Sequence, residues 1–431
     1  MTSLGNIAAD CRRLAGRKPL VGVLVLAALL RVAVVILNYG NFSTDTDNYL
    51  AIAENLLAGE GFCSEAGHPT AFRPPLYPLL VAASLFCGGT FALALVQIVL
   101  GTATAGLTAV YAARLGFSER VQIIAAGVIS VDPLLLIYTS HAMTETLITF
   151  LVTLLLIVAV GGGSQRRNVV SGGLFGLIVL CRPSLWAFGG LASVLFLYRR
   201  LRSAPASGDR GHWKRQVVLV LAGLLIVVSP WAVRNWAALG QPVVMTTHGG
   251  YTLLLANNPV FYEEVVEQGQ VWQRSSLHDW QAEIEESLQK QGLERSDEPG
   301  RDAAMRRLAT ENIQKFPVRF FYASLVRLQR FWGLAPGNGS VPELLRLGVG
   351  CWYLVVICFF LIGLVQNRKC FHDVRLGITL IISLSCVHAV YWSNARMRAP
   401  VSCILGTLAA SAACDLAGRK SVIGATNGNN S

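Results

Sequence analysis

Long apolar stretches alternate with polar or basic segments along this chain of 431 residues. A helix that crosses a bilayer needs about 20 apolar residues, and stretches near that length recur between residues 20 and 416. The pattern predicts an all-α integral membrane protein with about ten spans, at about 20–38, 90–113, 121–139, 144–160, 168–182, 184–198, 216–236, 347–365, 374–392 and 399–416.

Lys and Arg form short clusters beside these stretches, as at Arg12, Arg13, Arg17 and Lys18 before the first span. This positive-inside pattern places both termini in the cytoplasm and the residues from Asn41 onward on the outer side of an inner (plasma) membrane. Only 14% of the residues are charged, against about 25% in soluble domains. The net charge of +11 therefore faces anionic headgroups, and no nucleic-acid partner is expected.

The first outer loop, 41–89, carries an amphipathic helix pattern. Apolar residues recur at helical spacing at Tyr49, Ile52, Ala53, Leu56 and Leu57. After Arg73 comes an apolar run at 76–88, which is too short to span and is typical of an interfacial or re-entrant segment. We expect a juxtamembrane helix there, because counting it as a span would put Arg114 and Arg120 on the outer side.

A polar insert, 237–343, separates the first spans from the last three. It predicts helices at 276–291 and 301–315, followed by an interfacial helix at 317–332 whose arginines snorkel to the headgroups. We accordingly predict three parts. Residues 1–236 form an N-terminal transmembrane module with the first outer loop, residues 237–343 form an outer-face insert, and residues 344–431 form the C-terminal spans with a short cytoplasmic tail.

Acidic residues on the outer side are the first candidates for chemistry. Asp45 and Asp47 precede the amphipathic helix, where an acid caps free backbone N–H groups. Two acids cannot cap one helix in the same way, so one of them is free to act as a general base or a metal ligand. Glu145 opens a later span on the same side, and a second carboxylate would suit a divalent metal. Helix capping explains Glu145 equally well.

Four arginines stand at the outer ends of spans, where short loops are expected to be poor in Arg: Arg73, Arg234, Arg396 and Arg398. They predict either headgroup contacts or a clamp on a phosphate, for which the guanidinium fork is suited. Arg182 is a weaker member of this group. Tyr49, His248, Asn257 and Asn258 are candidates for a sugar or acceptor pocket, although turn geometry explains the paired amides nearly as well.

Ten cysteines are scattered along the chain without a CxxC pair, so neither a zinc knuckle nor a redox motif is expected. Cys63 and Cys87 both fall in the first outer loop, and the sequence leaves a disulfide between them open.

Five segments, in this order, resemble the GT-C superfamily of polyprenyl-phosphate-sugar glycosyltransferases, in the bacterial branch related to protein O-mannosyltransferases and lipid A aminoarabinose transferases. They are DTDNYLAIAENLLAGEGF, FRPPLYPLL, VDPLLLIYTSHAMTETL, SPWAVRNWAALGQPVVMTTHGGYTLLLANNP and RMRAP, between about residues 20 and 405. The resemblance implies a GT-C-like helical bundle and an inverting hexosyl or pentosyl transferase. Its donor would be a polyprenyl-phosphate-linked sugar, and its acceptor a protein, glycolipid or polysaccharide on the outer face.

The resemblance also implies roles for single residues. Asp45 matches the family's first-loop aspartate by its spacing to Tyr49, with Asp47 as the substitute, and Arg73 matches the basic residue that faces the lipid phosphate. Aminoarabinose transferases have an acid before that basic residue, where this chain has Phe72. Whether Asp45 and Glu145 hold a divalent metal is therefore left open by the sequence. A transporter or flippase of lipid-linked sugars is the alternative function, although no internal repeat supports it.

Overall fold

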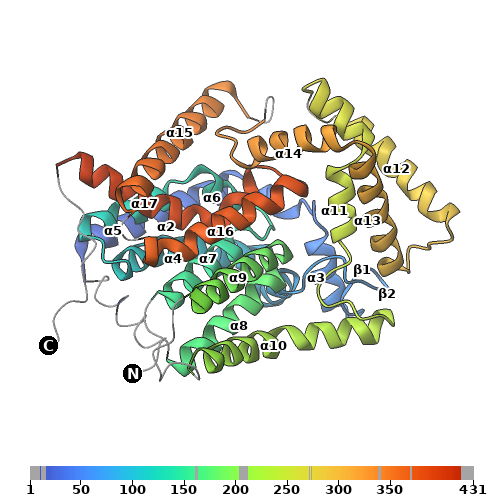
Figure 1. The fold of residues 1–431 in the computed structure, drawn as a ribbon, viewed down its shortest axis with the longest axis horizontal. Coiled ribbons are helices and arrows are strands. Elements are labelled where there is room, and N and C mark those ends of the chain that lie inside the picture. Colours follow the sequence, from blue (N-terminus) through green and yellow to red (C-terminus); the bar gives the residue numbers. More distant parts are fainter. Residues whose placement is uncertain are drawn as a thin grey trace.

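The structure, a computed structural model, describes residues 10, 16–160, 164–202, 212–270, 272, 274–337, 341–368 and 371–418. Helices make up nearly all of it (Figure 1). The helices of the N-terminal half are α2 (Lys18–Leu37), α3 (Tyr49–Leu57), α4 (Leu76–Arg114), α5 (Glu119–Ser130), α6 (Pro133–Tyr138), α7 (Glu145–Ala159), α8 (Gln165–Cys181), α9 (Trp186–Arg202) and α10 (His212–Leu239).

The second half adds the helices α11 (Gly249–Ala256), α12 (Arg274–Lys290), α13 (Glu298–Lys315), α14 (Pro317–Phe331), α15 (Glu343–Gln366), α16 (Phe371–Val390) and α17 (Ser402–Leu416). Shorter turns are η1 (Tyr39–Ser43), η2 (Pro183–Leu185), η3 (Phe261–Glu267) and η5 (Ala395–Val401), and β1 (Cys63–Glu65) pairs with β2 (His68–Pro69) in a small antiparallel hairpin. In the described part of the chain, five helices are long and apolar enough to cross a membrane: α2, α4, α10, α15, and η5 together with α17. The all-α, multi-pass membrane fold expected from the sequence is confirmed.

The centre of the bundle is α7, which is buried along nearly its whole length. Its sequence is apolar all round, as a helix surrounded by other helices requires. Its hydroxyls are all satisfied, since Thr149 and Thr153 each donate to the carbonyl four residues earlier and Thr146 donates to the carbonyl of Tyr138 in α6. The helix thus brings its first residue, Glu145, into the interior without leaving other polar groups unsatisfied.

Helix α4 breaks at Gly88 and Gly89, the boundary predicted between segment 76–88 and the following span. A straight helix would separate Tyr77 from Gln97 by about 30 Å, yet the side-chain amide of Gln97 donates to the Tyr77 hydroxyl at 3.3 Å. The segment before the break therefore folds back along the segment after it, and the predicted separation of the two is confirmed.

The predicted span at 121–139 is instead two short helices, α5 and α6, separated at Asp132. Pro133 has no backbone N–H and disfavours helical geometry at the residue before it. The Asp132 side chain accepts hydrogen bonds from the amides of Leu134 and Leu135, so it caps α6. Tyr353 of α15 donates to the same carboxylate at 2.7 Å and joins the break to the C-terminal helices.

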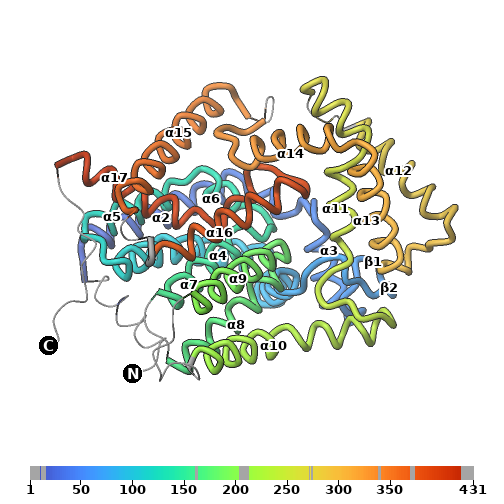
Figure 2. Tube along the Cα trace, in the orientation of Figure 1, coloured from blue at the N-terminus to red at the C-terminus, as the bar shows by residue number. Residues whose placement is uncertain are grey.

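Helices α11 to α14 belong to the segment predicted as the outer insert, and they lie at one end of the bundle, close to α3 and the β1–β2 hairpin (Figure 2). The predicted helices at 276–291 and 301–315 are confirmed as α12 and α13. Cys63 is buried and Cys87 is exposed, and no disulfide joins them.

The expected snorkelling to the headgroups is wrong for Arg327 of α14. Arg327 is fully buried and donates to the carbonyls of Ala256 and Ala389. Arg319 forms an ion pair with Glu267 at 2.7 Å, and Arg330 lies over the rings of Phe261 and Trp392. The arginines therefore attach α14 to the rest of the protein. The exposed side of the helix is instead apolar, with Val318, Phe321, Tyr322 and Leu325.

The fold-back of α4 predicts a strong requirement for glycine at position 89. Gly89 has φ +67° and ψ −155°, a region that is essentially restricted to glycine and costs other residues about 1–3 kcal/mol. Gly89→Ala should therefore lower the thermal midpoint of the purified protein. Gly190→Ala on an exposed turn of α9, where a Cβ meets no atom within 4 Å, is the matched control. Equal midpoints for the two variants would contradict the prediction.

Candidate active site

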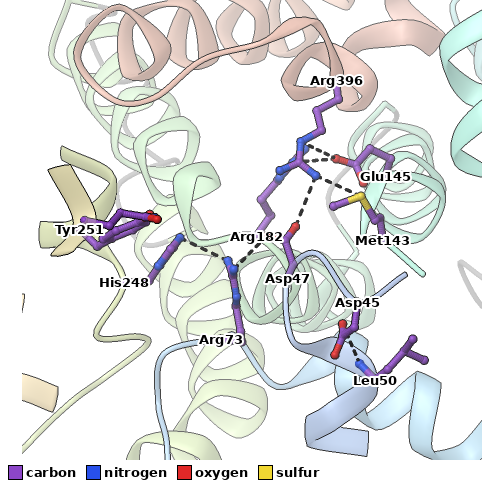
Figure 3. A network of polar contacts seen from close by, with 11 residues as sticks. Asp45, Asp47, Leu50, Arg73, Met143, Glu145, Arg182, His248, Tyr251 and Arg396 are labelled. Carbon is purple, nitrogen blue, oxygen red and sulfur yellow. Dashed lines mark hydrogen bonds and ion pairs between the residues drawn. The ribbon is translucent and has the colours of Figure 1, made fainter. Parts of the chain in front are cut away.

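Asp45 and Asp47 have different surroundings, although one residue separates them. The two carboxylate oxygens of Asp45 accept hydrogen bonds from the backbone amides of Leu50 and Ala51, at 3.1 and 2.9 Å. Asn48, with φ +59° in the left-handed region, turns the chain just before α3 begins. Asp45 therefore caps α3, whereas Asp47 lines a cavity and faces Arg396 (Figure 3).

That cavity has a volume of about 550 Å³. It lies where the first outer loop, the starts of α7 and α11, the end of α8 and the η5 turn meet. Asp47, Tyr49, Arg73, Arg182, His248 and Arg396 are among its lining residues. A cavity of this size falls within the range of about 300–1,000 Å³ that is usual for small-molecule sites.

Three guanidinium groups and the Asp47 carboxylate of the cavity wall form a charged network with the buried carboxylate of Glu145 (Figure 3). Asp47 accepts from Arg73 at 2.8 Å and from Arg396 at 3.4 Å. Glu145 accepts from Arg182 at 3.0 Å and lies 3.8 Å from Arg396. Three positive charges against two negative ones leave one net positive charge, so the network favours an anionic ligand.

Local sequence explains how two of these residues reach the cavity. Glu145 is the first residue of α7 and is fully buried. The positive end of the helix dipole stabilises its negative charge. Arg182 precedes Pro183, which disfavours helical geometry for it. It has φ −148° and ψ 98°, so α8 ends there. Its side chain can therefore leave the helix and enter the cavity.

Several buried polar atoms in the cavity wall have no hydrogen-bond partner: Arg73 Nε, Arg182 Nη1, Arg396 Nε, His248 Nδ1, His388 Nε2 and Ser184 Oγ. Oε2 of Glu145, which is paired with Arg182 through its other oxygen, has none either. Buried polar atoms are satisfied in the large majority of cases. Three of these atoms are guanidinium donors. Their concentration in one cavity indicates that a ligand with several acceptor oxygens completes them.

His248 adds a neutral donor to this set. Its Nε2 lies 3.2 Å from Arg73 Nη1, and since a guanidinium can only donate, Nε2 accepts and Nδ1 carries the proton. Burial, reinforced by the charge of Arg73, lowers the pKa of His248 well below its usual value of 6.5. The imidazole is therefore neutral at physiological pH, and its Nδ1–H is available to an acceptor.

The outer insert holds the two segments that carry Arg73 and His248. Glu298, at the start of α13, accepts hydrogen bonds from the Ala71 amide and the Thr247 hydroxyl, both at 2.8 Å. It also accepts from the Thr70 hydroxyl. A Cβ at Gly250 would lie 2.0 Å from the Asp302 carbonyl oxygen, so only glycine permits the close approach of α11 and α13.

Several predicted site residues lie away from the cavity. Arg234 donates to the carbonyls of Phe62 and Thr70, and Arg398 donates to the carbonyl of Gly333 and stacks on the Tyr353 ring. Asn257 and Asn258 are buried and bonded to backbone groups of their own turn and of neighbouring segments. The structure therefore brings Asp47, Tyr49, Arg73, Glu145, His248 and Arg396 together, and leaves Asp45, Arg234, Arg398, Asn257 and Asn258 outside.

Arg182 is the residue that sequence reasoning undervalued. It contacts Glu145 directly and lines the cavity. The signal that could have identified it is the Arg-Pro pair at the end of an apolar stretch, because Arg73 and Arg182 both stand immediately before a proline. His388 was missed as well, since it lies inside the apolar pattern of α16.

The residues do not fit the divalent metal left open by the sequence. Within the described ranges, no group of three or more His, Cys, Asp and Glu side chains comes close enough to hold a metal ion. Both oxygens of Asp45 accept from backbone amides, and Glu145 is paired with arginine. Hard cations take clustered oxygen ligands, whereas here guanidinium groups neutralise the carboxylates.

Solved structures share this fold, although no protein-family model and no curated protein matches the chain. The archaeal oligosaccharyltransferase AglB from Archaeoglobus fulgidus, in complex with an inhibitory peptide and a dolichol-phosphate, matches with a TM-score of 0.51 and 17% identity over 92% of this chain and 50% of that one. The apo form of the Archaeoglobus fulgidus oligosaccharyltransferase matches with a TM-score of 0.50 and 18% identity, over 92% and 51%.

ArnT from Cupriavidus metallidurans bound to undecaprenyl phosphate has a TM-score of 0.40 and 16% identity, over 90% of this chain and 77% of that one. At these identities the oligosaccharyltransferase matches establish the fold alone, and the shared fold agrees with the resemblance drawn from the sequence motifs. The chain spans about half the length of the oligosaccharyltransferase structures that it matches.

The capping role of Asp45 predicts a loss of stability on its removal. Asp45→Ala leaves two backbone amides of α3 without their acceptor and should cost about 1 kcal/mol of unfolding free energy. Glu54→Ala, on the exposed side of the same helix, is the control and should change stability little. Thermal unfolding of both variants measures the difference. If Asp45→Ala proves as stable as Glu54→Ala, the capping role is wrong.

The lowered pKa of His248 predicts a loss of stability in acid. Because the folded state keeps this imidazole neutral, only the unfolded state gains a proton below about pH 6.5. Stability that is present above pH 6.5 is thus lost as the pH falls, by up to about 1.4 kcal/mol per pH unit. Between pH 7.5 and 5.5, the thermal midpoint should fall further in the wild type than in His248→Gln. Equal falls of the thermal midpoint in the two proteins would contradict the prediction.

Proposed function

We propose that the protein is a membrane glycosyltransferase that transfers a sugar from a polyprenyl-phosphate donor to an acceptor hydroxyl on the outer face of the inner membrane, with both termini in the cytoplasm. The observation that carries this proposal is the set of unpartnered guanidinium donors around a cavity that also contains Asp47. Support comes from the shared fold of the archaeal oligosaccharyltransferase, whose structure contains a dolichol-phosphate.

The arginines suit a leaving group whose negative charge increases during the reaction. A sugar phosphodiester carries one negative charge, and the departing polyprenyl phosphate gains a second as the bond from the anomeric carbon to oxygen breaks. Arg73, Arg182 and Arg396 would bind the departing phosphate more tightly than the donor. Interactions that strengthen in the transition state accelerate the chemical step.

Asp47 is the proposed general base. The acceptor oxygen forms a bond to the anomeric carbon from the side opposite the phosphate, and its proton passes to the Asp47 carboxylate. This single displacement inverts the anomeric centre. Donor phosphate would compete with Asp47 for Arg73 and Arg396, which now lie 2.8 and 3.4 Å from its oxygens. Binding of the donor would thereby free the carboxylate to accept a proton.

The scope of the substrates follows from the same reasoning. The donor sugar would be a hexose or a pentose, and the acceptor a hydroxyl of a protein, glycolipid or polysaccharide. No metal is assigned a step, because the carboxylates of the cavity are already paired with arginines.

The proposal predicts separable losses in two variants. In proteoliposomes supplied with a radiolabelled polyprenyl-phosphate sugar, Asp47→Asn should lower turnover by about 10²–10⁴-fold, the usual contribution of a general base. Arg73→Gln should lower it by about 10²–10³-fold, as the loss of one transition-state donor does. Arg319→Gln, which removes an arginine of an exposed ion pair outside the cavity, should retain wild-type turnover.

Near-wild-type turnover of Asp47→Asn would exclude the proposed base. Movement of labelled lipid across the bilayer without a glycoside product would instead favour a transporter of lipid-linked sugars.

A further inference from the structure

A second, smaller cavity of about 250 Å³ lies between the outer insert and the first outer loop. Helices α12 and α13 form one side of it. Phe72 and Tyr251 form the other side. Nothing in the proposed donor chemistry uses this cavity, because Asp47 and the three arginines line the larger one.

The two cavities meet at a group of aromatic rings. The centroids of Phe72 and His248 lie 4.3 Å apart in an edge-to-face arrangement, and those of His248 and Tyr251 lie 5.4 Å apart. Tyr251 lines both cavities, and Figure 3 shows it beside His248 and Arg73. A molecule in the smaller cavity would therefore lie next to the charged network in the larger one.

The wall of the smaller cavity combines flat apolar faces with planar polar groups. Phe72, Tyr251 and Trp280 supply aromatic rings, with Ile284 beside them. Gln281 donates to the Tyr251 hydroxyl at 2.8 Å, and Glu285 is paired with Arg301 at the same wall. Aromatic side chains with a polar end are suited to ligands that are apolar on one side and hydrated on the other.

We propose that the smaller cavity binds a saccharide unit of the acceptor; this inference rests on the proposed glycosyltransferase function. A sugar ring has C–H faces that pack on aromatic rings, and hydroxyls at its edge that suit amide and ionic groups. The Glu285–Arg301 pair makes the wall unsuitable for a lipid chain, because burying charges against hydrocarbon is costly. At about 250 Å³, the volume suits one small ring. The acceptor is thus a glycan or a glycolipid, extended by one sugar.

Binding to the full-length protein in detergent tests the proposal, with methyl glycosides of glucose, galactose, mannose and N-acetylglucosamine as probes in saturation-transfer NMR. At least one probe should show a saturable signal. Ile284→Phe fills the cavity and should weaken that binding at least 10-fold. Ala282→Phe adds the same ring on an exposed position of α12 and should leave the binding unchanged.

A second variant decides the question if Ile284→Phe fails to fold. Gln281 is exposed and donates to the Tyr251 hydroxyl, so Gln281→Ala should fold normally and weaken glycoside binding about 3- to 10-fold. Absence of a saturable signal from every glycoside, or binding that both variants leave unchanged, would overturn the proposal. So would competition for the cavity by a serine-containing peptide but by no glycoside.

Farnesyl phosphate separates this inference from the proposed function. It should bind to wild type and Ile284→Phe equally, and at least 10-fold more weakly to Arg73→Gln. If farnesyl phosphate binds in this way while the glycosides do not, the saccharide subsite alone is wrong. If the glycosides bind and farnesyl phosphate does not, the donor assignment fails and the subsite remains.

Discussion

The site depends on one electrostatic constraint: it buries more arginine side chains than carboxylates to neutralise them. Arg73, Arg182 and Arg396 share only Asp47 and Glu145, so the protein carries a net positive charge away from bulk water. Removing charge from water is costly unless partners replace the lost hydration. The unpartnered guanidinium atoms show that this replacement is incomplete. A rigid scaffold is needed to hold like charges so close together, and the buried α7 at the centre of the bundle provides one.

The insert completes that scaffold from the other side. Glu298 of α13 connects the segment before Arg73 with the segment before His248, which are far apart in the sequence. Arg327 of α14 also connects distant segments, since it donates hydrogen bonds to carbonyls near the end of α11 and near the end of α16. The insert is therefore part of the site's construction, and its own small cavity opens beside the aromatic rings that border the larger one.

Much of this arrangement could be predicted from the sequence, and the exceptions share a cause. Hydropathy and charge gave the helical bundle, the boundary near Gly88 and two insert helices. Asp45 and Asp47 could not be told apart, because the left-handed turn at Asn48 decides which one reaches the α3 amides. Arg327 resembled a snorkelling residue because its partners lie 62 and 71 residues away. The role of Arg182 could not be predicted, because its partner Glu145 lies 37 residues away and no local sequence pattern connects the two.

The fold-back at Gly88 and Gly89 has a consequence for the number of times the chain runs along the bundle. Arg73 precedes α4 and Glu145 begins α7, yet Arg73 lines the cavity and Glu145 pairs with Arg182 of the same cavity wall. The chain must therefore run along the bundle an even number of times between them. The second part of α4 runs one way, and α5 with α6 runs back beside it. Had 76–88 been a further full-length passage, Glu145 would lie at the opposite end of the bundle, so two adjacent glycines keep Arg73 and Glu145 at the same end.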